Sequence, residues 1–126
     1  MPSYPASSNQ SNVVTVAAVD EFNQLAYYSN YGQRTVEFAA PGSNIMSTIP
    51  PSSYGTHDGT SQAAGVTAGV IALLLATYRQ AGFDVTGRAR EVRSMLLDVG
   101  IKPAPVLKNF VQTGALCHYL CYTLAI

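Results

Sequence analysis

The sequence predicts an α/β fold in which an open parallel sheet packs against helices. Two features support this prediction: short apolar runs that each end in a turn, and one long apolar run, Ala63 to Tyr78, that follows a glycine–threonine–serine turn. Short β-branched runs are typical of buried parallel strands, whereas a run of this length is typical of a helix. In open α/β sheets ligands bind beyond the carboxyl ends of the strands, so the turn before the long run is the candidate site.

Composition limits the kind of protein and its partners. The 126 residues are 48% hydrophobic and 11% charged, with a formal net charge of zero. This composition is sufficient for a hydrophobic core, and at most one domain is expected. Because the net charge is zero, nothing in the composition indicates binding to nucleic acid or to a membrane surface. The polar first 12 residues predict a loop without a secretory signal, which leaves the compartment open.

The first half of the chain predicts strands joined by turns. A β-branched run ended by an acidic turn indicates the first strand, a shorter extended piece follows, and a third strand stops at Pro41 and Gly42. A segment rich in proline, serine and threonine then predicts a surface loop. The strands are expected at 12–20, 24–29 and 35–39, and the loop at 43–55.

The turn Asp58-Gly59-Thr60-Ser61 has two interpretations. A serine at the start of a helix lies at the positive end of the helix dipole beside unpaired N–H groups, which suits a nucleophile and the oxyanion it creates. Thr60 or Ser61 could instead be only an N-cap, which is their commonest use before an apolar run. The turn alone leaves both open.

The apolar run after the turn predicts a buried central helix rather than a membrane span. From Ala63 to Tyr78 it covers about 24 Å of helix, short of the roughly 30 Å hydrocarbon core. Small residues, among them Gly65 and Gly69, allow close packing on a sheet, and apolar residues on every face indicate cover all round.

Helices are predicted for the rest of the chain. The second helix begins near Val85 and Thr86, with Thr86 as cap and with Val92, Met95, Leu96 and Val99 on one side. Its three arginines, Arg88, Arg90 and Arg93, are expected on a solvated face. A final apolar helix is predicted at 114–126, with Cys117 and Cys121 as thiols because two cysteines in one helix pair poorly.

Four landmarks in order identify the chain with a known family. They are "FNQLAYYSNYG" from Phe22, "TVEFAAPGSNIMSTIP" from Thr35, Tyr54, and "DGTSQAAGVTAGVIALLLA" from Asp58. This series resembles the C-terminal half of the catalytic domain of subtilisin-like serine proteases. The resemblance implies a subtilisin-like partial domain: a loop at 1–12, strands and loops at 13–57, the nucleophile turn and central helix at 58–81, and helices at 82–126.

The resemblance also implies roles for residues of the turn. Ser61 corresponds to the family's nucleophile, with Gly59 and Thr60 supporting the turn and the oxyanion site. The family's acid, base and side-chain oxyanion donor lie in motifs that this chain does not contain, so the missing N-terminal half of the domain would be needed as a partner. A polypeptide substrate, and secretion of the complete protein, are expected.

Two further sets of residues suggest chemistry that we do not expect. His57 and Asp58 lie close to Ser61 in sequence, but adjacent residues of a turn point apart, so a local triad is not predicted and His57 should be solvated. By the same resemblance, Glu37 corresponds to a position at which subtilisins place a carboxylate near a weakly bound cation. We expect Glu37 to be a surface acid on an edge strand, with no metal here; a structural calcium is conceivable only in the complete domain.

Three functions therefore remain. The first is a serine endopeptidase acting through an acyl-enzyme on Ser61. The second is a non-catalytic remnant or interaction module of the same fold. The third, a small membrane-associated protein built on the apolar run, is the least supported. At the start of that run the family pattern is altered at four positions: Gln62, Gly65, Val66 and Thr67.

Overall fold

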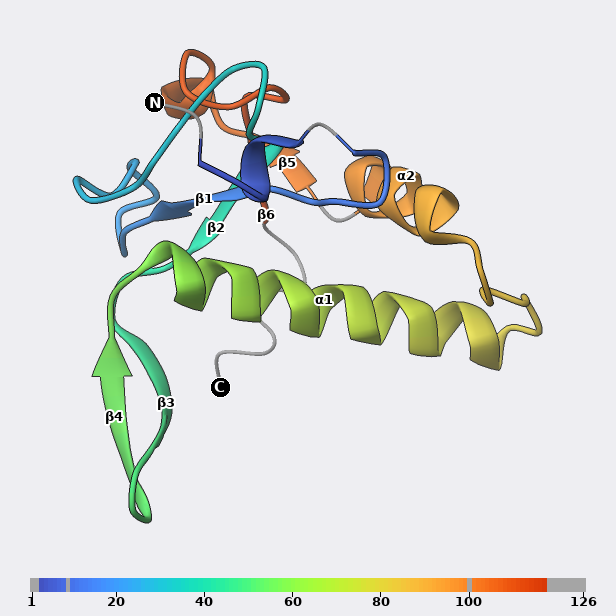
Figure 1. The fold of residues 1–126 in the computed structure, drawn as a ribbon, viewed down its shortest axis with the longest axis horizontal. Coiled ribbons are helices and arrows are strands. Elements are labelled where there is room, and N and C mark those ends of the chain that lie inside the picture. Colours follow the sequence, from blue (N-terminus) through green and yellow to red (C-terminus); the bar gives the residue numbers. More distant parts are fainter. Residues whose placement is uncertain (1–2, 9, 100, 118–126) are drawn as a thin grey trace.

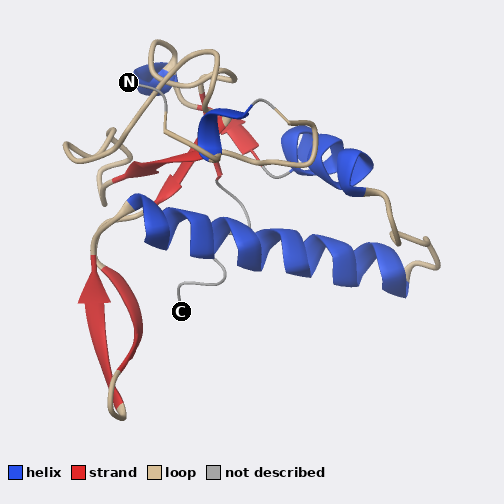
Figure 2. Cartoon of the chain, viewed as in Figure 1, coloured by secondary structure: helices blue, strands red, loops and turns tan. Residues whose placement is uncertain are grey.

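A computed structural model describes residues 3–8, 10–99 and 101–117 of the chain. Its centre is a sheet with the strand order β1–β2–β6–β5. Helices α1 (Thr60–Gln80) and α2 (Ala89–Val99) lie beside this sheet (Figure 1). A separate antiparallel hairpin, β3–β4, projects away from the N-terminal end of α1, as Figure 2 also shows.

The central sheet is open and mainly parallel, as the sequence predicts. β1 (Val16–Val19) pairs in parallel with β2 (Phe38–Pro41), which pairs in parallel with β6 (Ala115–Cys117). Only β5 (Ile101–Pro103), at one edge, is antiparallel to its neighbour. The carboxyl ends of β1 and β2 therefore meet at one edge of the sheet, where the chain leads to the hairpin and α1.

Side chains alternate between the two faces of the sheet, as strand geometry requires. Phe38 and Ala40 face the helices, where they pack with Leu96 of α2. Ala39 faces the other side and packs with Leu107, which belongs to the short 3-10 helix η2 (Pro105–Leu107). Another 3-10 helix, η1 (Ala6–Ser8), lies near the N-terminus. The apolar runs of β1 and β2 thus reflect burial on both faces.

The predicted third strand starts later than expected. β2 begins at Phe38 rather than Thr35 because Thr35 and Val36 close a turn, their N–H groups donating to the Gly32 carbonyl at 3.2 and 2.9 Å. The turn at Gly32 therefore extends into the segment whose β-branched residues predicted a strand.

The extended piece predicted at 24–29 is wrong. The Asp20 carboxylate accepts N–H groups from Phe22 and Gln24 at 2.9 Å each, which reverses the chain against β1. The Ser29 hydroxyl then accepts the Ala18 N–H at 2.9 Å, and Ala26 donates to the Ala18 carbonyl. This segment covers part of the β1 edge instead of forming a strand.

The loop predicted at 43–55 is also wrong, because β3 (Ile45–Ile49) and β4 (Ser53–His57) form a hairpin in this region. Two prolines at its tip supplied the loop signal, while the alternating residues on either side form the strands. The segment is nevertheless on the surface as expected, with Met46 65% and Tyr54 73% exposed.

Helix α1 confirms the predicted central helix but has less cover than expected. Ala63, Thr67, Val70 and Leu74 are buried, a spacing that places one face against β1 and β2. The opposite face is open, and Leu73 is 40% exposed. Among the described residues, therefore, α1 is not packed against other elements on all sides.

The length argument against a membrane span is wrong, since α1 has 21 residues, about 31 Å. By length and composition α1 could cross a membrane, with a mean hydropathy of 1.5 and 22% of the apolar window buried. This is weak evidence, because core helices of soluble proteins pass the same test. The buried face of α1 against the sheet is the observation that favours a core helix.

Thr67 has a buried hydroxyl with no hydrogen-bond partner among the described residues. Its side chain is 4% exposed. Thr67→Val removes the hydroxyl and keeps the shape, so we expect the free energy of unfolding to rise by about 1–2 kcal/mol in urea titrations. Thr77→Val is the control, because the Thr77 hydroxyl donates to the Leu73 carbonyl on an exposed face. Equal effects of the two changes would contradict this account.

The C-terminal third departs most from prediction. α2 begins at Ala89 rather than near Val85, and the turn before it is closed by the Asp84 carboxylate, which accepts the Thr86 N–H at 2.9 Å. Hydrogen bonds from the backbone and then the hydroxyl of Thr86 lower the pKa of Asp84. Thr86 lies in this turn, before α2 begins, so it is not the helix cap that the sequence predicts.

The final helix predicted at 114–126 is wrong where the structure describes it. Ala115–Cys117 forms β6, a central strand buried on both faces, and short apolar runs of this kind do not distinguish helix from strand. Cys117 is disulfide-bonded, so the expected thiol is also wrong; the argument against pairing assumed a helix. The rest of the prediction, including Cys121, lies outside the described residues.

Candidate active site

Ser61 is an exposed residue in the first turn of α1. The helix begins at Thr60, directly beyond the β3–β4 hairpin and beside the carboxyl ends of β1 and β2 (Figure 1). Its neighbours Gly59, Thr60 and Gln62 are half-buried, and Asp58 is exposed. A serine in this position is within reach of a polypeptide from solvent.

The helix N-terminus has no side-chain cap, so the capping interpretation of Thr60 and Ser61 is wrong. The N-cap is Gly59, whose carbonyl accepts the N–H groups of Gln62 and Ala63 at 3.1 and 3.3 Å. The N–H groups of Thr60 and Ser61 precede the first helical acceptor and stay unpaired within the helix. Two donors at the positive end of a helix dipole thus lie beside the Ser61 hydroxyl.

Gly59 has an extended backbone, with φ 162° and ψ 158°, and its position is crowded. A Cβ there would lie 2.5 Å from Oε1 of Gln62, which is the end of a flexible side chain. Because that side chain can move aside, neither the available space nor a left-handed conformation requires glycine at this position. The supporting roles assigned to Gly59 and Thr60 in oxyanion binding remain predictions.

The neighbouring His57 and Asp58 do not form a triad with Ser61. His57 ends β4, where it is exposed and pairs with Ile45. The Asp58 carboxylate accepts the Asn44 N–H at 2.6 Å and is committed to the loop that follows β2. His57 is the one histidine of the described residues, and no base is held against Ser61 there.

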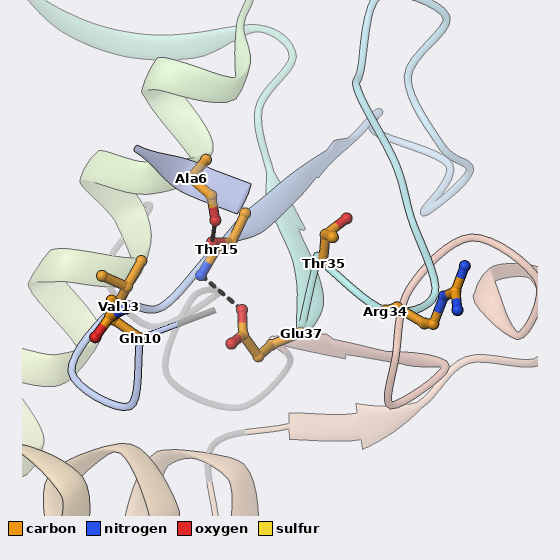
Figure 3. A pocket seen from close by; sticks show the side chains of 7 residues that line it. All are labelled: Ala6, Gln10, Val13, Thr15, Arg34, Thr35 and Glu37. Carbon is orange, nitrogen blue, oxygen red and sulfur yellow. Dashed lines mark hydrogen bonds between the residues drawn. The ribbon is translucent and has the colours of Figure 1, made fainter. Parts of the chain in front are cut away.

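Glu37 is not the surface acid that the sequence predicts. Its Oε1 lies 2.8 Å from Nη2 of Arg93 on α2. Its Oε2 accepts the Thr15 N–H at 2.7 Å, as Figure 3 shows. The Glu37 side chain is only 12% exposed. Both oxygens are thus occupied by internal donors, an arrangement that does not fit a cation ligand.

The pairing with Glu37 also corrects the solvated face predicted for α2. Arg88 and Arg90 are exposed, whereas Arg93 is half-buried and its Nε has no partner among the described residues. The sequence spacing places the three arginines on one helix. It does not show that Glu37, next to β2, forms an ion pair with Arg93.

Breaking this ion pair should destabilise the chain. Glu37→Gln leaves the Arg93 guanidinium half-buried without its counter-charge, so we expect a loss of about 1.5–3 kcal/mol in the free energy of unfolding. Urea denaturation measures the loss. Glu91→Gln is the control, since Glu91 is exposed on the same helix. A loss no larger than that of the control would show that the pair contributes nothing.

Sequence reasoning missed the contacts that hold the turn of Ser61. Gly59 donates its N–H to the Gly42 carbonyl at 2.8 Å, and Asn44 donates to Asp58. The signal present in the sequence was Pro41-Gly42, which predicted only the end of a strand. Its partner at 58–59 is separated in sequence by the whole hairpin.

Comparison with known proteins agrees with these features. The family model described as the Subtilase family matches residues 1–102. Subtilisin-like protease 2 of Plasmodium falciparum is 39% identical over 111 residues, which is 88% of this chain and 8% of that protein. The minor extracellular protease Epr of Bacillus subtilis is 42% identical over 97 residues, covering 77% of this chain and 14% of that protein.

Other relatives cover more of their own length, but still a minor part. The major intracellular serine protease of Bacillus subtilis is 33% identical over 114 residues, 90% of this chain and 34% of that protein. This chain therefore spans about a third or less of the length of these curated relatives.

Solved structures show the same fold. A structure titled for subtilase cytotoxin SubAB assembly has a TM-score of 0.76 and 24% identity, covering 97% of this chain and 42% of that one. The prenylagaramide maturation protease PagA has a TM-score of 0.70 and 28% identity, covering 90% and 40%. With the family match over most of its length, and with Ser61 in the first turn of a sheet-packed helix, the chain belongs to the subtilase family of serine proteases.

Proposed function

We propose that this chain supplies the nucleophile of a serine endopeptidase whose catalytic domain is completed by residues outside these 126. The observation that supports the proposal most is the Ser61 hydroxyl beside the unpaired N–H groups at the start of α1. The substrate class is a polypeptide, as expected for the family. Secretion is part of the proposal for the complete protein, although relatives named as extracellular and as intracellular both occur.

The proposed reaction proceeds through an acyl-enzyme. The Ser61 Oγ attacks the carbonyl carbon of the scissile peptide, its proton passes to a histidine base, and the Ser61 N–H donates to the developing oxyanion. The base returns the proton to the leaving amine as the C–N bond breaks. Water then hydrolyses the ester and frees Ser61.

The open face of α1 supports the need for a further part of the domain. Ala64, Ala68 and Ala72 are in positions along the side of α1 that faces away from the sheet, and Ala64, Ala72 and Leu73 are exposed. An apolar helix without cover on one side is unfavourable in water, and a covering segment would bury that surface. β1 is likewise an edge strand, only part of which is covered by Ala26 and Ser29.

We therefore expect the isolated chain to be inactive and prone to associate through the open edge. The test is labelling with a fluorophosphonate probe, with the chain alone and after adding the separately expressed N-terminal half of a related catalytic domain. Labelling at Ser61 only after addition supports the proposal, and peptide mapping identifies the labelled residue. Peptide hydrolysis by the pure chain that Ser61→Ala abolishes would refute the need for completion.

The second candidate is a non-catalytic module of the same fold. The observation in its favour is that the described residues hold no base near Ser61, since His57 is exposed at the end of β4. No labelling in either state, from a sample with the α-helix and β-sheet signature of the fold, would favour this candidate over the protease.

A further inference from the structure

Two hydrogen bonds join the loop after β2 to the residues before Ser61. Gly59 N–H donates to the Gly42 carbonyl at 2.8 Å, and Asn44 N–H donates to Oδ1 of Asp58 at 2.6 Å. The first lies between backbones, and the second has a charged acceptor, which makes it the stronger of the two. Together they form a clasp, defined here as residues 42–44 with residues 58–59.

Gly42 holds its side of the clasp by close packing. It donates to the Val19 carbonyl at 3.0 Å, which continues the β1–β2 pairing. A Cβ at Gly42 would lie 2.6 Å from the Cβ of Ala18 and 2.7 Å from the Gly59 carbonyl oxygen. Ala18 is fully buried, so neither neighbour can move freely. The gap between the sheet and the start of α1 therefore admits only glycine without displacement.

Asn44 holds the other side through its backbone conformation. Its φ is 55°, in the left-handed region that asparagine tolerates better than most residues. Its N–H donates to Asp58, which directly follows the other strand at the base of the hairpin. The clasp thus closes the base of β3–β4 as well as the start of α1.

The helix N-terminus has no side-chain cap to order it in any other way. We propose that Asp58 and Gly42 are positioning residues that order the backbone of Gly59, Thr60 and Ser61, so that the Ser61 hydroxyl and N–H face the substrate together. This inference rests on the proposed function of Ser61, but the ordering itself can be measured without activity. A nucleophile and its oxyanion donor in one residue need such a fixed backbone, because small misplacement lowers the rate steeply.

The first test is amide hydrogen exchange of the chain, followed residue by residue by NMR. Asp58→Ala should speed exchange at Asn44 and Gly59 by about 10-fold or more, because the carboxylate acceptor is lost and the loop opens. Asp84→Ala is the matched control, since it removes a carboxylate acceptor of a backbone N–H beyond the other end of α1. The control should leave exchange at Gly59 unchanged.

Asp58→Asn and Gly42→Ala are the second and third variants. The asparagine keeps an acceptor oxygen and should restore much of the protection at Asn44, whereas the alanine should remove protection at Gly59 by pushing the two segments apart. Unchanged exchange at Gly59 and Asn44 in Asp58→Ala would overturn the inference.

Probe labelling separates this inference from the proposed function. In the completed domain, the probe should label Ser61 of Asp58→Ala at least about 10-fold more slowly than Ser61 of wild type. It should label Asp84→Ala at the wild-type rate. Faster exchange in Asp58→Ala without any labelling of wild type would reject the protease and keep the clasp. Normal labelling of Asp58→Ala would reject the positioning role and keep the protease.

Discussion

Ser61→Ala is expected to lower kcat of the completed domain by about 10⁶-fold, the size of loss that follows removal of the nucleophile in subtilisin. The hydroxyl is the atom that bonds to the substrate carbonyl in the proposed reaction, and no other group in the turn can replace it. The free energy of unfolding should change by less than about 0.5 kcal/mol, since Ser61 lies at the surface end of α1 and its side chain caps nothing. Hydrolysis of a chromogenic peptide and urea denaturation measure the two quantities.

Ser53→Ala is the matched control for this change. Ser53 is exposed on β4 and loses the same hydroxyl at a distance in sequence from the turn. We expect its activity to equal that of wild type. Retention of a tenth or more of the activity by Ser61→Ala would place the nucleophile elsewhere and would remove the basis of the proposed function.

Phe38→Ala should produce the largest loss of stability, about 3–5 kcal/mol. Phe38 is fully buried in β2 and belongs to the same core cluster as Leu96 of α2 and Val70 of α1, so the cavity would lie where sheet and both helices meet. Because small domains are stable by only about 5–15 kcal/mol, a loss of this size would remove much of the stability of the chain. Urea denaturation followed by circular dichroism measures the change.

Phe22→Ala tests whether burial, and not the loss of a phenyl ring as such, causes this effect. Phe22 is 74% exposed in the turn after β1, and its replacement should change the unfolding free energy by about 0.5 kcal/mol or less. Similar losses for the two variants would mean that the core does not lie where sheet and helices meet.

The start of the central helix could be predicted because its signals are local. Gly59, Thr60 and Ser61 precede an apolar run too long for a strand, and the helix begins at Thr60 as that pattern requires. The first strand is likewise confirmed within 12–20. A resemblance carried by short landmarks in order identified the family, and the family match over residues 1–102 confirms it.

Elements whose signals depend on distant partners were predicted wrongly. Ala115–Cys117 is a strand because it fits between β2 and β5, and three apolar residues carry no periodicity that could show this. Ile45–Ile49 is a strand because residues 53–57 return beside it. In both cases the pairing partner, and not the segment itself, decides the conformation.

By itself, then, the sequence determined the family and the helix that begins at Thr60, since each depends on neighbouring residues in the chain. Only the tertiary structure decided which polar groups meet: Glu37 with Arg93, and Asp58 with Asn44. The physical reason is that a short charged contact between distant residues depends on how strands and helices pack, which leaves no periodic trace along the chain. The same holds for Gly42, whose need for glycine arises from Ala18 and Gly59 lying against it.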